Sequence, residues 1–410
     1  MKKLEKFSLG IGDRFGKEAT AQLAALQMAA DQGVVIAPVW NKSFREHSLI
    51  GTGPQATHEA ATRAVQEAQW QGPYHLDADH IGLKTVDAFL PYCDFFTIDV
   101  ADFIGEAGEN GALIREALAP LAGRSFPSLG VDQPLDEVTL DLFVSQYGHA
   151  LYEAARIYHY IAGQKESFIA EVSTDEADTP QSPLELFLIL GALAKQGVMV
   201  QTIAPKFTGR FNKGVDYIGD VGQFAKEFEQ DLTAIRMAVE EFGLPENLKI
   251  SVHSGSDKFS LYGPIRTLLD KHDAGLHLKT AGTTWLEEMI GLARHGGRCL
   301  EVAKQICLAS LGRIDELSAP YATVIDIDRQ ALPNADTIRA WSGDELAAAL
   351  THDLSDPRFN SSMRQLVHVS FKVAAEMESE FLNALDEGRA EISQCVTHNL
   401  YERHIKPLFL

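Results

Sequence analysis

The sequence predicts an α/β fold, a closed (β/α)8 barrel that carries a helical insertion and a helical C-terminal extension. Short apolar or β-branched runs recur along the first two thirds of the chain, and helix-like stretches separate them. Strands that alternate with helices form parallel sheets, and eight such strands favour a closed barrel over an open sheet. The predicted strands span residues 6–11, 34–39, 74–78, 95–100, 167–172, 198–203, 248–252 and 275–278.

Two segments do not fit the simple alternation of strand and helix. Residues 105–165 are longer than one connection needs and have a helical pattern of their own, so they are predicted to be an insertion. Beyond residue 285 the pattern is almost entirely helical. We therefore expect a catalytic barrel over residues 1–285 and a helical region over residues 286–410 that packs on it. This tail is also a candidate contact for a homo-oligomer.

The composition excludes several classes of protein. The chain has 410 residues, 45% of them hydrophobic, and a formal net charge of −21. Nucleic-acid binding needs clustered Lys and Arg, which such a charge disfavours, although a local basic pocket can still hold an anionic substrate. The four cysteines form no CxxC pair, and the most apolar stretch, residues 184–200, is interrupted by charged residues and glycines. These features predict a cytoplasmic protein without a membrane span.

Imidazole and carboxylate groups gather at the predicted strand ends, where barrel enzymes carry their functional groups. A single His at such a position is usually a structural residue, and an Asp is often a helix cap. Several of them around one axial cavity indicate instead a divalent metal ion such as zinc, manganese or nickel. The candidate ligands are His80, His253, His277 and Glu171.

Some of these motifs resemble class II, metal-dependent ketose aldolases. The third strand reads YHLDADH at residues 74–80, and the later motifs are FFTID at 95–99, ISVHSGSD at 250–257 and LKTAGTTW at 278–285. The resemblance implies that Asp79 is a catalytic acid or base and that His80 binds the metal. The chain departs from this pattern at residues 204–220, where a further ligand His is expected and none is present. His277 is the candidate replacement.

A second resemblance extends along nearly the whole chain. The motifs KFTGRFNKGVDY at residues 206–217 and SVHSGSDK at 251–258 are similar to those of the tagaturonate epimerase family. This resemblance implies a divalent-metal enzyme that interconverts the sugar acids tagaturonate and fructuronate. The two sugars differ at a hydroxyl-bearing carbon β to the ketone, whose proton is not acidic. A retro-aldol step followed by an aldol step can invert it, with the metal as Lewis acid.

This chemistry assigns roles to further residues. Asp79 and Glu171 are the candidates for proton transfer, and Lys206 or Lys258 is the candidate for holding the developing alkoxide or the substrate carboxylate. The substrate carboxylate needs a cation, for which Arg210, Lys213 and Lys258 are candidates beside Lys206. Ser254 and Gly255 are predicted to let the backbone approach the ligand.

Two other functions fit the same residues. One is a class II aldolase that releases its products and acts on a phosphorylated ketose, with the loop at residues 254–256 as a phosphate site. The other is a non-catalytic barrel subunit, against which Asp79, His80 and His253 argue. Transient oxidation by a nicotinamide is disfavoured, because no GxGxxG motif follows a strand.

Overall fold

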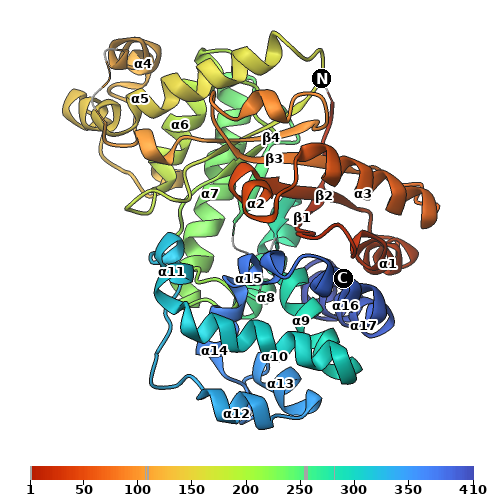
Figure 1. Cartoon of the computed structure of the whole chain (residues 1–410). Helices are drawn as coiled ribbons and strands as arrows, with labels where there is room; N and C mark the ends of the chain where they lie inside the picture. Colours follow the sequence, from red (N-terminus) through yellow and green to blue (C-terminus); the bar gives the residue numbers. More distant parts are fainter. Residues whose placement is uncertain (1, 107, 109, 254–256, 281) are drawn as a thin grey trace.

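Eight parallel strands form a closed barrel at the centre of the molecule (Figure 1). The computed structural model describes residues 2–106, 108, 110–253, 257–280 and 282–410. The strands follow one another around the barrel in sequence order, and β8 closes it by pairing with β1. They are β1 (Phe7–Ile11), β2 (Ile36–Ser43), β3 (His75–Ile81), β4 (Phe95–Asp99), β5 (Ile169–Ser173), β6 (Thr202–Ala204), β7 (Lys249–Val252) and β8 (Leu276–Lys279). The predicted fold class is confirmed.

Several strands extend beyond their predicted ends, and β2 and β3 do so by more than one residue. β2 runs through Asn41 and Lys42 to Ser43, and β3 runs on to Ile81. Polar residues at these positions look like loop in the sequence, but here they pair across the sheet, Asn41 with Asp77 and Ser43 with Asp79. The extra length carries polar side chains into the mouth of the barrel.

Helices between the strands cover the outside of the barrel. They are α1 (Ala19–Asp31), α2 (Phe44–Ile50), α3 (Pro54–Glu67), α6 (Pro183–Lys195), α7 (Val221–Phe242) and α8 (Phe259–His272). Two of them start at a capping box, in which Ser43 pairs with Glu46 and Ser182 with Glu185. The capping box of α2 begins directly at the last residue of β2, so this helix lies at the rim of the barrel.

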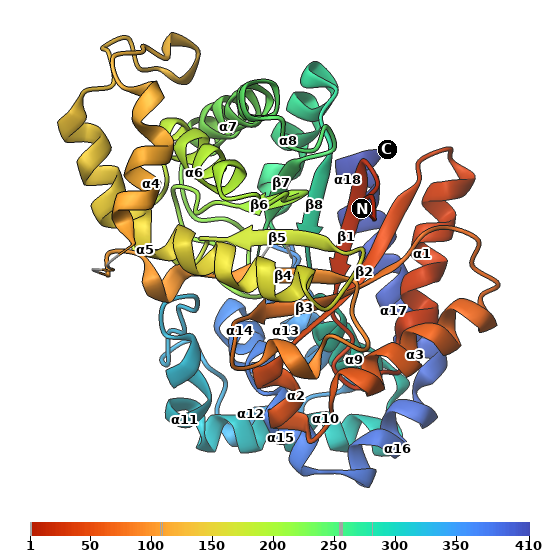
Figure 2. The same cartoon turned by 90° about the horizontal axis from the view of Figure 1, so that it is seen from above.

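The predicted insertion between β4 and β5 is helical. It contains α4 (Gly111–Leu118) and the long helix α5 (Glu137–Ala162), whose N-cap is Asp136. Figure 2 shows α4 and α5 side by side at one flank of the barrel. The buried face of α5 includes Phe143, Tyr147 and Leu151. The insertion therefore packs as a flank of the barrel and leaves the cavity described below to other elements.

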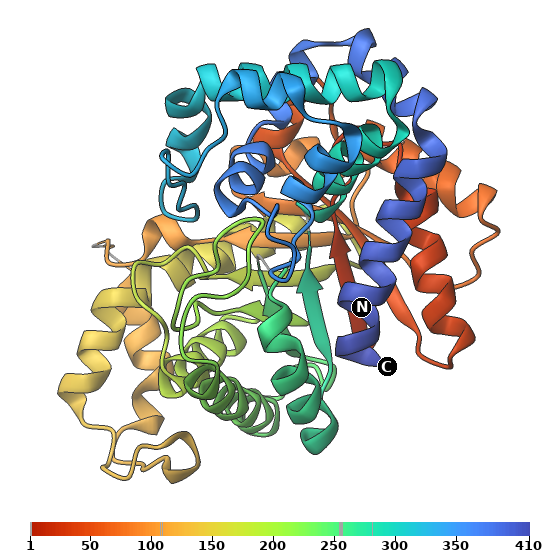
Figure 3. The ribbon, with the colours of Figure 1, turned by 90° about the horizontal axis from the view of Figure 1, so that it is seen from below.

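Most of the C-terminal region is a layer of helices across one end of the barrel, and its last part runs along the outside of the barrel against α1 and α8 (Figures 1 and 3). It comprises α9 (Thr283–His295), α10 (Gly297–Gly312), α11 (Ile314–Ser318), α12 (Ala335–Ala340), α13 (Gly343–Leu350), α14 (Ser361–His368), α15 (Phe371–Glu376), α16 (Ser379–Glu387), α17 (Arg389–His398) and α18 (Lys406–Phe409). The two ends of the chain lie close together (Figure 3). The ring centroids of Phe7 and Phe409 are 5.1 Å apart. In the described part of the chain, no helix is long and apolar enough to cross a membrane.

A buried ion pair joins this region to the loop after β7. Arg364 of α14 donates from Nε to Asp257 Oδ2 at 3.0 Å and to the Gly214 carbonyl at 2.7 Å, and both charged side chains are almost fully buried. Burial alone would raise the pKa of Asp257, but the Arg364 guanidinium holds it well below its usual range. The C-terminal region is thus fixed to the ends of two barrel strands.

We predict that Arg364→Met lowers the free energy of unfolding by about 3–5 kcal/mol, because Asp257 would stay buried without its cation. Urea denaturation measures this loss. The pair contributes fully to the free energy of unfolding above the pKa of Asp in the unfolded chain, about 3.9. Folded Asp257 has a lower pKa, so this contribution is lost as the pH falls from that value through the folded-state pKa.

The matched control is Arg358→Met, which removes an exposed arginine paired with Asp356 on the surface. It should leave the unfolding midpoint nearly unchanged. Equal midpoints for the Arg364 and Arg358 variants would contradict the structural role of the buried pair.

Candidate active site

A cavity of about 400 Å³ opens where the carboxyl ends of the strands meet the C-terminal region. In barrel enzymes this end of the strands carries the active site. The strands contribute Asn41, Asp79, His80, Asp99, His253 and Lys279 to its lining, and the C-terminal region contributes Tyr321 and His368. The cavity is therefore built jointly by the barrel and by the helices that cover it.

An irregularity in β3 directs two consecutive side chains toward this cavity. Neighbouring residues of a regular strand point to opposite faces. Here the pairing with β4 shifts between Ala78 and Ile81, and His80 has a left-handed backbone with φ of 50°. A bulge of this kind re-aims side chains next to active sites. Asp79 and His80 consequently both line the cavity.

The floor of the cavity is organised around the ammonium group of Lys279. Its Nζ lies 2.8 Å from Asp79 Oδ1, 3.0 Å from Asp77 Oδ2 and 3.1 Å from Glu171 Oε1, and it donates to Thr97 Oγ1 at 2.7 Å. These residues come from β8, β3, β5 and β4. One buried cation therefore holds carboxylates from two other strands in fixed positions.

A glycine makes room for this lysine. Gly10 of β1 pairs with Lys279 across the closure of the barrel. A Cβ atom at Gly10 would lie only 2.8 Å from Lys279 Cγ and 3.2 Å from His277 Nε2. Any larger residue at this position would push the lysine away from its carboxylates.

Two imidazoles face each other above this floor, with ring centroids 5.5 Å apart. His80 donates from Nδ1 to Asp99 Oδ2 at 2.9 Å. His253 donates from Nε2 to Glu171 Oε1 at 2.8 Å, while its Nδ1 lies 3.2 Å from Asp175 Oδ2. Each ring is thus oriented by at least one carboxylate, as is usual for imidazoles that bind metals or transfer protons.

The charges of the cluster displace the pKa values of its members. Burial would raise the pKa of Asp79, but Lys279 and His80 outweigh it and bring the pKa to about 2. Burial would lower the pKa of both imidazoles; nearby carboxylates, chiefly Asp79 for His80 and Asp175 for His253, instead raise these values to about 10 and about 9. Without a bound ligand, the site is a network of paired charges with Asp79 ionised at neutral pH.

The structure separates the predicted metal ligands into two layers. His80 and His253 line the cavity. Glu171 is fully buried just below them, and its Oε2 has no hydrogen-bond partner among the described residues. His277 lies deeper still, with Nδ1 2.8 Å from Ser8 Oγ and its ring 5.3 Å from that of Phe95. Burial lowers the pKa of His277 to about 3, so this imidazole is neutral.

Of the four cationic residues predicted to bind the substrate carboxylate, one lines the cavity. Lys213 lines the cavity, with its Nζ 5.8 Å from the centroid of the Tyr321 ring. The other three are not among the residues that line it in the described chain. Arg210 pairs with Asp326 on the surface, Lys258 donates to two backbone carbonyls, and Lys206 is half-buried. Ser254 and Gly255 lie outside the described residues.

Several polar lining residues were not identified from the sequence, and two of them have buried donors with no hydrogen-bond partner among the described residues. Arg14 is buried after β1, and its Nε and Nη1 have no hydrogen-bond partner among the described residues. Its guanidinium lies 4.2 Å from the ring centroid of Phe371 in the C-terminal region, and Nη2 lies 3.2 Å from Glu46. The Asn41 side-chain amide is likewise buried without a hydrogen-bond partner in the described structure. Arg14 follows the end of β1 and Asn41 lies near the end of β2, so the same positional argument could have found them.

These donor groups suit a divalent metal ion. The observation that favours it is the buried Glu171 Oε2, which forms no hydrogen bond with the described residues, together with the 3.2 Å approach of His253 Nδ1 to a second carboxylate oxygen, Asp175 Oδ2. Imidazole nitrogen and carboxylate oxygen are ligands of zinc and of similar ions. His80 and His253, with Glu171 or Asp175, are the residues that would hold the ion.

Comparisons with known proteins agree in pointing to one family. The chain matches the profile of UxaE, tagaturonate epimerase, over residues 1–408. It is 28% identical to the tagaturonate/fructuronate epimerase of Thermotoga maritima, covering 97% of this chain and 80% of that protein.

Solved structures share the fold. The native fructuronate-tagaturonate epimerase UxaE from Cohnella laeviribosi matches with a TM-score of 0.83 at 24% identity, covering 100% of this chain and 82% of that one. Its complex with one glycerol matches with a TM-score of 0.82 at 25% identity, covering 98% and 81%. On the strength of the profile match along nearly its entire length, the chain belongs to the tagaturonate epimerase family.

Proposed function

We propose that the protein interconverts D-tagaturonate and D-fructuronate by breaking and re-forming a carbon–carbon bond inside the cavity. The observation that carries the proposal is the combination of two features in one cavity. One is an ionised Asp79 beside Lys279 and the two imidazoles, and the other is a pair of Arg14 donors on the wall that form no hydrogen bond with any described residue. The family and the name of the Thermotoga maritima relative support this substrate pair.

The proposed step balances without an external oxidant or reductant. A base removes the proton of the hydroxyl group β to the ketone, that carbon becomes an aldehyde, and the electron pair of the broken bond forms an enediolate. Rotation of the aldehyde half presents its other face. The bond then forms again, the hydroxyl recovers its proton, and the configuration is inverted.

Asp79 is placed to act as the base. It lines the cavity and is ionised, whereas Glu171, the other candidate, lies below the lining. Lys279 holds Asp79 at 2.8 Å and supplies positive charge beside it. Since the same charge lowers the pKa of Asp79 to about 2, the carboxylate is a weak base until substrate changes its surroundings. Asp79 takes the proton of the substrate hydroxyl when the bond breaks and returns it when the bond forms again.

The wall of the cavity is suited to the carboxylate of the substrate. Arg14 offers Nε and Nη1, which form no hydrogen bond with the described residues and can each donate to an anionic oxygen. Lys213 adds a second charge, and burial together with Arg14 lowers its pKa. The carboxylate belongs to the aldehyde half, so this anchor would keep that half in place while its reacting carbon rotates. The Asn41 amide is available to a sugar hydroxyl.

We predict that Arg14→Gln raises KM for both uronates by about 10- to 100-fold, the loss expected for a charge-assisted hydrogen bond. The assay follows conversion of fructuronate to tagaturonate. Arg63→Gln, at an exposed position of α3, is the matched control and should keep the wild-type KM. An Arg14 variant with unchanged KM would place the carboxylate elsewhere.

A divalent metal ion is the cofactor we propose for this site, held by His80 and His253 with a carboxylate. Such an ion would polarise the ketone oxygen and stabilise negative charge that develops on it. Zinc, manganese and nickel all accept this ligand set.

His80→Ala should therefore lose the barrel-bound equivalent of metal and activity together while the protein remains folded. Metal content is measured by elemental analysis and folding by circular dichroism. His58→Ala, which changes a histidine of α3 outside the cavity lining, is the control and should retain both. Full metal content in the His80 variant would refute this ligand assignment.

Asp79→Asn should bind metal nearly as the wild type does but lose roughly two or more orders of magnitude in kcat, the scale of general acid–base catalysis. The retro-aldol step also predicts that the inverted carbon keeps its own hydrogen. In heavy water, deuterium entering at that carbon in step with turnover would exclude this route. A three-carbon aldehyde that accumulates, with no epimer, would identify an aldolase instead.

A further inference from the structure

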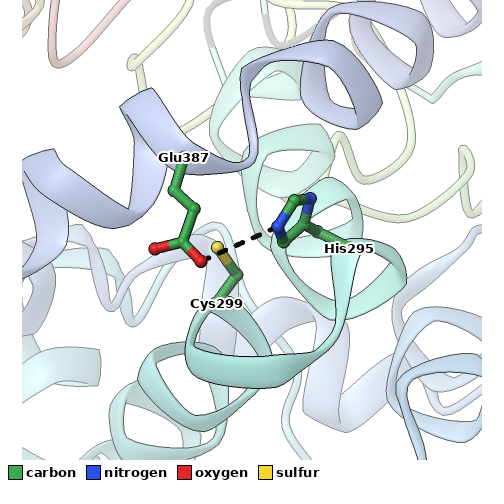
Figure 4. Close-up of side chains that lie close together, drawn as sticks. All are labelled: His295, Cys299 and Glu387. Carbon is green, nitrogen blue, oxygen red and sulfur yellow. Dashed lines mark ion pairs between the residues drawn. The ribbon is translucent and has the colours of Figure 1, made fainter.

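Three side chains of different ligand types converge in the C-terminal region, outside the cavity lining. They are His295 at the end of α9, Cys299 in the first turn of α10 and Glu387 at the end of α16 (Figure 4). One ligand atom from each lies within 4.8 Å of the other two. It is the single group of three such residues that the described part of the chain brings this close together.

A fourth residue fixes the orientation of the imidazole. His295 donates from Nδ1 to Glu391 Oε2 at 3.0 Å, which leaves Nε2 on the side of Glu387, 3.8 Å from its Oε1. Histidines that bind metals usually donate their other ring nitrogen to a carboxylate in this way. Glu391 therefore presents His295 Nε2 toward the other two ligand atoms.

The thiol of Cys299 is buried, whereas its two partners reach solvent. The side chains of His295 and Glu387 are 28% and 46% exposed. Cys299 Sγ donates weakly to the Ala384 carbonyl at 3.5 Å. Burial and the nearby Glu387 carboxylate raise the pKa of this thiol, so it keeps its proton until a cation replaces it. An ion can thus enter from the solvent side and reach an anchored sulfur atom.

We propose that His295, Cys299 and Glu387 bind one divalent transition-metal ion, of which zinc best matches a nitrogen, sulfur and oxygen ligand set. Zinc–ligand bonds of about 2.0–2.3 Å place tetrahedral ligand atoms roughly 3.3–3.8 Å apart. The observed spacing reaches this range by rotation of the exposed Glu387 side chain. The ion replaces the thiol proton, which is released to solvent, and water completes the coordination.

Such an ion would connect the junction of α9 and α10 to the end of α16. α9 begins immediately after Gly282, which lines the cavity, and Glu391 belongs to α17, which packs along α9. The expected role is structural, because the site offers no adjoining cavity for a substrate among those that the described residues form.

Cobalt(II) distinguishes this site from the one proposed in the barrel. No cysteine lines the barrel cavity in the described chain, so thiolate-to-cobalt charge-transfer absorption in the near ultraviolet would report on Cys299 alone. Metal-free full-length protein is titrated with cobalt chloride. We expect the band in the wild type, in His80→Ala and in Cys307→Ala, a control on the same helix.

The band should be lost in Cys299→Ser and strongly weakened in His295→Gln, and zinc should abolish it at stoichiometric concentration. In the His80→Ala background, zinc should also raise Tm, and Cys299→Ser should remove that rise. Absence of the band in the wild type, its persistence in Cys299→Ser, or a requirement for a large excess of cobalt would overturn the proposal. These measurements use no substrate, so they stand whether or not the protein is an epimerase.

Discussion

The contact between Lys279 and its three carboxylates is the interaction on which the active site depends. Asp77, Asp79 and Glu171 are all buried, and like charges this close could not remain ionised together without a cation among them. Asp77 shows the limit of this compensation: burial raises its pKa to about 6 despite the neighbouring lysine. The lysine also forces two features of the barrel, a glycine opposite it on β1 and a hydroxyl group at Thr97.

The sequence predicts the barrel well because its signals are local. Apolar runs and helical periodicity identify all eight strands. Because they also locate the end of the third strand, they predict that Asp79 and His80 lie at the carboxyl end of the barrel. The depth of a side chain is harder to predict. His277 and Lys279 both belong to β8 and point the same way, yet they lie in successive layers, and only Lys279 reaches the cavity.

The cationic residues near the cavity show why the sequence does not reveal which side chains face the substrate. Lys213 and Arg210 are three positions apart in one loop, and the sequence offers no reason to choose between them. Their positions depend on distant contacts: the Lys213 amide donates to the Val324 carbonyl, and the Arg210 side chain pairs with Asp326. Arg14 is similarly held by Phe371. Non-local packing, which periodicity does not reveal, therefore decides which cation faces the substrate.

The shared construction of the cavity has a consequence for how enzymes of this architecture can diverge. Arg14 comes from the start of the chain, whereas Tyr321 and His368 come from the C-terminal helices, and all three border the same small volume. A barrel transplanted without its own helical cover would keep its reactive floor but lose the part of the wall that Tyr321 and His368 supply. Directed evolution toward other sugar acids should accordingly randomise the two ends of the gene together. Recombination between relatives at the boundary after β8 should yield mostly mismatched, inactive chimaeras.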